Sequence, residues 1–404
     1  MAKPICRVLP YALLVVCMPS FGEIRFNGFA TFATGLTGGS DESLYGYDDS
    51  LSFKENSIFG LQVSSDLGDG LDATVQIKAE GSDDWDTVFE WAYIGYELNE
   101  NVKFIMGRQR QAFYLYSQIV DVGYAYHWIT PPRGVYSLPF DSTDGVSVLI
   151  SNSFGAVESS FQLLVGRTQT EISFGGQASE LDAKNGITVN WTLNYDWFSF
   201  RIGHTESKLD LAIADIDDLA AAWTTAAAGY RLAGFNDIAG RMESVTGGIQ
   251  IQEDDASFSG VGITIDYEKF LFVAEATRLD LSDSFIGTND SAFASFGYRI
   301  NDTVMVHFTH GIDEDKGASG VLDGIPLDLT GGTVPQLDEP LNQLILGTQA
   351  VLSSGNEESD YNTFGVRWDF HSAAALKIEY TQFSNDLNRT RDADLLQFAV
   401  STVF

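Results

Sequence analysis

The chain has 404 residues, with 56 acidic and 23 basic side chains that give a net charge of −33 at pH 7. This charge disfavours nucleic acid as a partner, and 44% hydrophobic and 13% aromatic residues are too many for a disordered chain. Both cysteines, Cys6 and Cys17, fall in the first 22 residues, so the rest can hold no disulfide, cysteine nucleophile or thiolate-metal site.

The first 22 residues have the pattern of a secretory signal. Two basic residues accompany an apolar run at 9–18, and Ser20 and Gly22 supply the small side chains that a signal peptidase recognises. The run is about half as long as a transmembrane helix requires. We therefore predict a signal peptide at 1–22 and a mature chain that begins at Glu23.

From there to the last residue, apolar and polar residues alternate in short segments. In residues 71–80 every odd position is apolar and every even position is polar or charged. Such alternation predicts a strand with one apolar and one polar face. A length of about ten residues is typical of strands that cross a bilayer and exceeds the usual strand of a soluble sheet.

Similar segments occur in pairs joined by tight turns. The predicted pairs are 59–67 with 71–80, 91–98 with 102–107, 146–151 with 156–166, 187–195 with 198–205, 258–267 with 270–277, 292–300 with 303–310, and 363–370 with 374–384. Strands at 24–33 and 395–404 open and close the mature chain.

Long polar connections separate these pairs. They run approximately over 36–56, 81–87, 108–144, 167–185, 206–257, 278–291, 311–360 and 385–394, and within the fifth only a weak helix is predicted, at 215–234. Short turns at one end and long loops at the other are typical of outer-membrane barrels. The predicted fold is therefore all-β: a 16-stranded antiparallel transmembrane β-barrel over 23–404, with short periplasmic turns and long extracellular loops.

Aromatic residues gather at the tight-turn ends of the strands, where a membrane-interface girdle is expected. They are Tyr96, Tyr195, Tyr267, Tyr298, Phe370 and the terminal Phe404.

Segments at both ends and near the third connection resemble the Gram-negative general porin family. The resemblance rests on Ile24-Arg25-Phe26-Asn27-Gly28-Phe29, on Met106-Gly107-Arg108-Gln109, and on Phe398-Ala399-Val400-Ser401-Thr402-Val403-Phe404. It implies a homotrimer, an assembly signal at Phe404 and a third loop, at about 108–144, that folds into the barrel and narrows it. This loop departs from the family's usual Pro-Glu-Phe-Gly-Gly core and reads Tyr124-Ala125-Tyr126-His127-Trp128-Ile129-Thr130-Pro131-Pro132-Arg133.

Charges on the polar faces are expected to point into a water-filled lumen, because outward placement near the bilayer midplane would cost about 2–4 kcal/mol each. Basic residues with this parity are Arg25, Lys78, Arg201, Arg299, Arg367 and Lys377, whereas the inward direction of Arg108 rests on the resemblance. We predict a pore constriction in which Arg25, Arg108 and Arg110 face the loop acids Asp121, Asp141 and Asp144. The alternative is that these residues are ordinary solvated charges.

The expected function is that of an outer-membrane porin, a channel for passive diffusion of small hydrophilic solutes and ions. A solute-specific uptake channel is the main alternative, and a β-barrel hydrolase a distant one. Enzymatic activity is not predicted, because His204 and His310 fall on the lipid face and no histidine follows a serine elbow.

No cofactor or specific metal site is predicted, although the acidic runs at 254–255 and 313–315 could bind calcium or magnesium. The expected partners are outer-membrane lipid and lipopolysaccharide, further copies of the chain, and small solutes.

Overall fold

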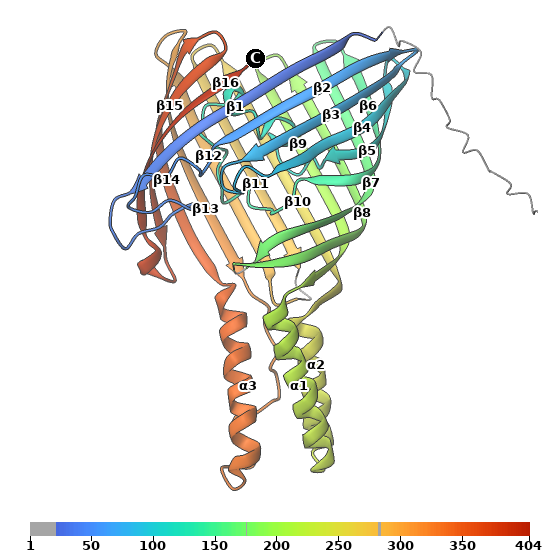
Figure 1. The fold of residues 1–404 in the computed structure, drawn as a ribbon, viewed down its shortest axis with the longest axis vertical. Coiled ribbons are helices and arrows are strands. Elements are labelled where there is room, and N and C mark those ends of the chain that lie inside the picture. The colour runs from blue at the N-terminus through green and yellow to red at the C-terminus, as the bar shows by residue number, and fades with distance from the viewer. Residues whose placement is uncertain (1–21, 175, 282–283) are drawn as a thin grey trace, which may run out of the picture.

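The computed structural model describes residues 22–174, 176–281 and 284–404, so the predicted signal peptide lies outside them apart from Gly22. In these ranges sixteen antiparallel strands form one closed barrel in chain order, with β16 bonded to β1 (Figure 1). Closure pairs the backbone groups that a free strand edge would expose. The predicted fold class is confirmed.

The strands are β1 (Ile24–Thr37), β2 (Ile58–Gly68), β3 (Leu71–Glu80), β4 (Thr87–Asn99), β5 (Val102–Arg110), β6 (Ser142–Phe154), β7 (Val157–Phe174), β8 (Gln177–Tyr195), β9 (Phe198–Ala212), β10 (Ile251–Tyr267), β11 (Phe270–Leu281), β12 (Gly287–Arg299), β13 (Val304–Lys316), β14 (Glu357–His371), β15 (Ala374–Asn385) and β16 (Ala393–Val403).

The two faces of the barrel differ as the alternation predicts. Ile94, Met106 and Phe364 point outward with 56%, 68% and 51% of their surface exposed, whereas Ser147 and Thr309 point inward and are buried. An apolar outer face suits lipid, and a polar inner face suits water and hydrogen-bonded side chains. No helix in the described ranges is both long and apolar enough to cross a bilayer.

The tight turns lie where the sequence predicts them, and aromatic side chains surround that end of the barrel. Tyr96, Tyr195, Tyr267 and Phe370 are between 42% and 51% exposed there, and Tyr298 is partly exposed. We call this the turn end and the opposite side the loop end.

At the loop end the strands run further than predicted. The expected connection at 167–185 is wrong, because β7 and β8 continue through it as a hairpin. Ion pairs on the extended part join neighbouring strands: Arg167 lies 2.6 Å from Asp182, and Lys184 lies 2.7 Å from Asp210. Polar residues that look like a loop in the sequence thus form cross-strand pairs.

Helices project from the loop end (Figure 1). The β9–β10 connection contains α1 (Ala214–Leu232) and α2 (Asn236–Ile249), and the β13–β14 connection contains α3 (Pro335–Ser354). The weak helix predicted at 215–234 forms as the complete helix α1, whereas α2 and α3 are not predicted from the sequence.

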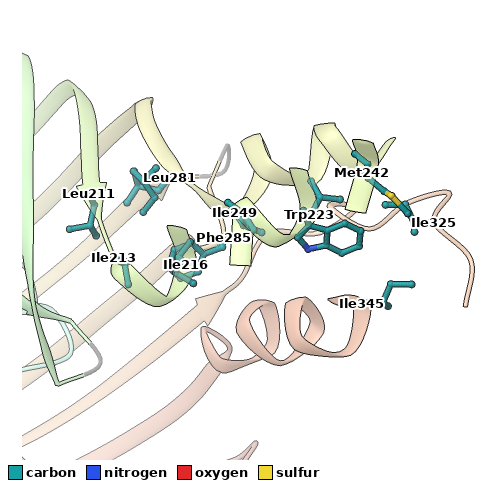
Figure 2. Packing of buried hydrophobic residues seen from close by; sticks show 14 of the residues in the cluster. Leu211, Ile213, Ile216, Trp223, Met242, Ile249, Leu281, Phe285, Ile325 and Ile345 are labelled. Carbon is teal, nitrogen blue, oxygen red and sulfur yellow. The ribbon is translucent and has the colours of Figure 1, made fainter. Parts of the chain in front are cut away.

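The helices have an apolar core of their own. Trp223 of α1, Met242 of α2 and Leu341 of α3 are fully buried in one cluster. Figure 2 shows this cluster continuing from the helices to Leu211 and Leu281 at the ends of the wall strands. The indole Nε1 of Trp223 also donates to Thr348 Oγ1 at 2.8 Å, which ties α1 to α3.

Candidate functional site: the loop inside the barrel

The connection between β5 and β6 folds into the lumen. We call residues 111–141 the lumen loop. Trp128 Nε1 donates to Thr309 Oγ1 of β13 at 2.8 Å, and the Ile129 amide donates to Glu379 of β15 at 2.8 Å. Because β13 lies halfway round the ring from β5, the loop reaches the opposite wall.

Apolar side chains seat the loop on that wall. Phe113 and Trp128 pack edge-to-face on Phe258 and Phe293, with ring centroids 5.1 and 5.5 Å apart. Val273 of β11 is fully buried beneath the same cluster. Aromatic pairs of this geometry each contribute about 0.5–1.5 kcal/mol beyond the buried area, so the loop is anchored rather than loosely solvated.

Inward charges from the wall bind the loop's backbone. Glu275 accepts hydrogen bonds from the Leu115 amide at 2.6 Å and from the Tyr136 hydroxyl at 2.7 Å. Lys377 donates to the carbonyls of Gly123 and Trp128. These wall residues satisfy loop groups that would otherwise be buried without a partner.

Other inward basic residues act in the same way. Arg201 donates to the Ala112 carbonyl, and Arg367 donates to the Tyr126 carbonyl at 2.8 Å. The predicted inward direction of these side chains is therefore confirmed. Their role as loop anchors was not predicted from the sequence, because parity shows that a side chain points inward but not what it meets there.

Two of the predicted constriction residues from the loop meet Arg110 in a buried ion-pair cluster. Arg110 lies 3.0 Å from Glu90 and 3.1 Å from Asp141, and it also contacts Asp121. Lys78 lies 3.3–3.7 Å from the same three carboxylates. We call these five residues the ion-pair cluster.

Lys78 and Arg110 occupy the positions around the three carboxylates of the ion-pair cluster that a metal ion would need. The carboxylates of Glu90, Asp121 and Asp141 have oxygens within 4.8 Å of one another, but Lys78 and Arg110 already contact them. Burial tends to raise the pKa of Asp141, yet Arg110 and then Lys78 outweigh burial and lower the pKa to about 2. Asp141 is therefore a carboxylate at neutral pH.

The structure places Arg108 and Asp144 apart from this cluster. They pair with each other through two hydrogen bonds of 3.0 and 2.9 Å. The register of β5 with β6 is unbroken from Met106 to Arg108, so Arg108 shares the outward face of Met106, whereas the side chain of Arg110, the last residue of β5, turns into the ion-pair cluster. Gly107 has φ +129 but does not change the parity.

Arg25 also lies away from the cluster. It is opposite Ser64 near the turn end, its side chain is 68% exposed, and its ion-pair partner is Glu23 at 3.5 Å. Of the six predicted constriction residues, the structure thus brings together Arg110, Asp121 and Asp141.

Polar cavities pass beside the lumen loop. One of about 510 Å³ lies at the loop end, lined by residues such as Asp41, Glu357 and Arg391. It shares Arg133 with a second cavity of about 260 Å³, which in turn shares Tyr126 with a third of about 290 Å³ at the β12–β13 turn. The three cavities thus follow one another beside the loop, and each shares a lining residue with the next.

The middle cavity lies between the loop and the wall of β1 to β3. Its charged lining residues in the described chain are Glu55, Glu80, Asp121 and Arg133. Tyr126 separates it from the cavity at the turn end, and its hydroxyl donates to the Val120 carbonyl at 2.7 Å.

One histidine on the outer face has the partners of a hydrolase triad. The His204 ring lies 2.8 Å from Ser259 Oγ and 3.2 Å from Glu206. Both His204 and Ser259 lie within paired strands, directly opposite each other. Acyl transfer also needs amide donors for the oxyanion, and the amides of a barrel wall are engaged between strands. The arrangement therefore lacks part of a hydrolytic site.

An apolar outer face, a closed antiparallel barrel and a third connection folded inward define a membrane-spanning β-barrel with a loop inside its lumen. Neither a family model nor a curated protein sequence matches the chain. Solved structures with the same fold include Salmonella typhi OmpF in complex with daunomycin (TM-score 0.57, 12% identity, 95% of this chain and 98% of that one). DcaP of Acinetobacter baumannii (0.55, 12%, 95% and 97%) and the anion-selective porin from Comamonas acidovorans (0.53, 12%, 95% and 100%) also match. At this identity the likeness shows the shared fold.

Proposed function

We propose that the protein is an outer-membrane porin, a channel through which small hydrophilic solutes and ions diffuse passively. The observation that carries the proposal is the series of polar cavities beside the lumen loop, from the loop end to the turn end, which we take as the solute route. The inner wall is polar along this route, so permeating solutes can exchange water for hydrogen bonds with side chains. A solute-specific channel would share this architecture and differ in showing saturable transport.

We further propose that the lumen loop forms the constriction. It contacts the wall over half of the barrel, and Tyr126 separates two of the cavities. Deleting residues 124–133 should raise single-channel conductance in planar bilayers. If the deletion variant inserts normally and its conductance is unchanged, the constriction lies among the strands instead.

The charges around the middle cavity favour cations. The described lining carries Glu55, Glu80 and Asp121 against Arg133, and the ion-pair cluster behind Asp121 adds Glu90 and Asp141 against Lys78 and Arg110, so carboxylates exceed cations by five to three. Fixed charges at a narrow point act on each passing ion, even where they contribute little to stability. We expect a reversal potential of the cation-selective sign under a salt gradient.

Substitutions can test this charge assignment. Replacing Glu55 and Glu80 with glutamine should shift the reversal potential toward anions, and Arg133→Gln should shift it toward cations. Arg108→Gln is the matched control, because Arg108 lies on the outer face and should leave selectivity unchanged. An equal shift from Arg108→Gln would contradict the assignment.

Catalysis is not part of the proposal. If the outer-face group of Ser259, His204 and Glu206 were hydrolytic, purified protein would cleave phospholipid or short acyl esters and Ser259→Ala would abolish the cleavage. We expect no turnover above that of the Ser259→Ala variant.

We place the protein in the bacterial outer membrane as a homotrimer in contact with lipopolysaccharide, after removal of residues 1–22. One matching structure, an in-vitro folded OmpT of Vibrio cholerae, is a trimer form (TM-score 0.51, 11% identity, 95% of this chain and 99% of that one). Unheated protein should migrate in SDS gels as a compact trimer and boiled protein as an unfolded monomer. Mass analysis of the mature N-terminus should give Glu23.

A further inference from the structure

The inner wall of the barrel changes character toward the loop end. Along β9, the inward residues Thr205 and Ser207 are followed by Leu209 and Leu211. Along β11, Thr277 is followed by Leu279 and Leu281 in the same direction. An aqueous lumen does not call for inward leucines, because a porin interior is normally polar.

The four leucines, with Thr205 and Ser207, line a cavity of about 370 Å³, which we call the apolar chamber. Its floor is the lumen loop at Phe113, Leu138 and Phe140, and its wall includes Leu209 and Leu279. The apolar core of the helices begins at the same strand ends (Figure 2), so part of this apolar surface supports the helices. The chamber is the part of that surface which no protein side chain fills.

The size and lining of the chamber match those of small-molecule sites. Such sites have volumes of about 300–1,000 Å³ and are mostly apolar with a few polar groups that orient the ligand. Natural interiors leave few voids much larger than a water molecule. An apolar space of this size beside the solute route is therefore suited to an apolar body.

Two buried polar side chains, Gln111 and Thr143, also line the chamber. Gln111 and Thr143 are 4% and 2% exposed, and neither Gln111 Oε1 nor Thr143 Oγ1 has a hydrogen-bond partner in the described chain. Both side chains are part of the chamber lining and supply a few polar groups among the apolar ones.

Carboxylates add negative charge to the same lining. Asp313 and Asp315 accept hydrogen bonds from the neutral Asn289 at 2.7 and 2.8 Å, and neither has an ion pair in the described ranges. The described lining includes no lysine, arginine or histidine. The charge therefore complements a cationic head and disfavours an anionic one.

We propose that the apolar chamber binds small amphiphilic organic cations, molecules with an apolar or aromatic body and an ammonium head. The proposed role of this binding in uptake rests on the channel function proposed above, whereas the binding itself does not. Such a site would make the protein a channel that concentrates amphiphilic cations at its loop end.

The test uses the full-length mature protein in lipid nanodiscs, with empty nanodiscs as the background for partition into lipid. Calorimetric titrations compare 4-phenylbutylammonium with 4-phenylbutyrate, which has the opposite head, and with ethylammonium, which lacks the body. We expect saturable binding of 4-phenylbutylammonium alone. Equal binding of the phenylbutyrate, or no binding above empty nanodiscs, would overturn the proposal.

Variants then locate the site. Leu209→Ser together with Leu279→Ser should weaken binding at least about tenfold, because two apolar contacts are lost, and Asp313→Asn with Asp315→Asn should also weaken it. Leu346→Ser is the matched control, because Leu346 is a leucine of α3 with 58% of its surface exposed. If the control weakens binding as much as the chamber variants do, the site is elsewhere.

Conductance separates this proposal from the channel function. In planar bilayers, 4-phenylbutylammonium added at the loop end should produce brief current blocks. A conducting channel without calorimetric binding or blocks refutes the chamber and leaves the porin function intact. Calorimetric binding by a protein that conducts no ions supports the chamber and refutes the porin function.

Discussion

At the scale of single residues, Arg110 holds the lumen loop to the wall through charge. Its side chain is 1% exposed and contacts three carboxylates. Arg110→Met should lower stability by about 3–5 kcal/mol, because it leaves three clustered carboxylates with Lys78 as the one cation of the ion-pair cluster. The temperature at which the folded band is lost in SDS gels measures this.

Arg108→Met is the control for that prediction. Arg108 pairs with Asp144 on the outer face, where the side chains are 37% and 57% exposed, so its loss should cost no more than about 1 kcal/mol. Equal effects of the two substitutions would show that Arg110 has no special role.

The pKa of Asp141, lowered to about 2, makes a pH prediction. A carboxylate with a lowered folded pKa stabilises the fold above its unfolded pKa, about 3.9, and this contribution is lost as pH falls toward the folded pKa. The stability difference between wild type and Asp141→Asn should be constant above about pH 5, fall steeply as pH decreases toward 2, and vanish only below that pH. A difference that persists unchanged at pH 2 would contradict the ion pairing.

The sequence predicts whether a strand residue points inward or outward, but it does not predict which residues that side chain contacts. Lys78, Arg201, Arg367 and Lys377 point inward as the alternation predicts. Arg108 was expected inward because of a resemblance at Gly107, yet the register continues unbroken through that glycine. A bulge where β3 and β4 shift register between Gln76 and Ile77 leaves Glu90 out of the pairing, and its side chain lies in the ion-pair cluster.

At the scale of elements, the helices depend on one another more than the barrel depends on them. The buried face of α3, with Leu341 and Ile345, packs in the cluster that contains Trp223 of α1. Replacing residues 214–249 with a short glycine-serine linker should therefore unfold α3 as well. Far-UV circular dichroism should lose the helical signal of α1, α2 and α3 and retain the strand signal.

The barrel should survive that deletion, because its strands are paired without the helices. Unchanged heat resistance of the folded band is the expected control result. Retention of the α3 signal would show that α3 is stable on the barrel alone.

The strands were predictable because the alternation of apolar and polar residues repeats along the chain. The helices were not, because α2 and α3 contain glycine and proline residues that disfavour helix formation. Pro340 lies inside α3, and Gly240, Gly247 and Gly248 lie within α2. These residues have low helix propensity, so packing at Ala239, Met242, Val245 and Ile249 stabilises a helix that propensity alone does not indicate. The extension of β7 and β8 was missed for a related reason, since its polar residues pair across strands.

At the scale of the whole molecule, the number and order of strands followed from the sequence, but the contents of the lumen did not. Fourteen strands were predicted as seven hairpins, each a local pattern, and two more at the ends. The lumen loop is held by contacts between residues far apart in the chain, such as Ile129 and Glu379. The apolar chamber likewise arises from separate strands that meet only in the closed barrel.

The last residue extends the seam between β16 and β1. The Phe404 amide donates to the Gly28 carbonyl at 2.9 Å, and the Gly28 amide donates to the Phe404 carbonyl at 2.7 Å. The Phe404 ring covers Gly28, where a Cβ would lie 2.2 Å from it, and its centroid lies 6.2 Å from that of Phe59. The final residue thus joins β16 to β1 and β2 on the outer face.

Phe404→Ala should therefore reduce the amount of folded barrel, because the backbone bonds remain but the ring that covers the seam is lost. Phe370→Ala is the control, since Phe370 is an exposed ring at the same end but lies away from the seam. Folded yield from lipid vesicles, measured as the heat-modifiable band, should fall several-fold for Phe404→Ala only. Single-channel conductance of the barrels that do form should equal that of wild type, because Phe404 lies outside the lumen. Normal yield with altered conductance would assign Phe404 to conduction and would remove the argument that the seam limits assembly.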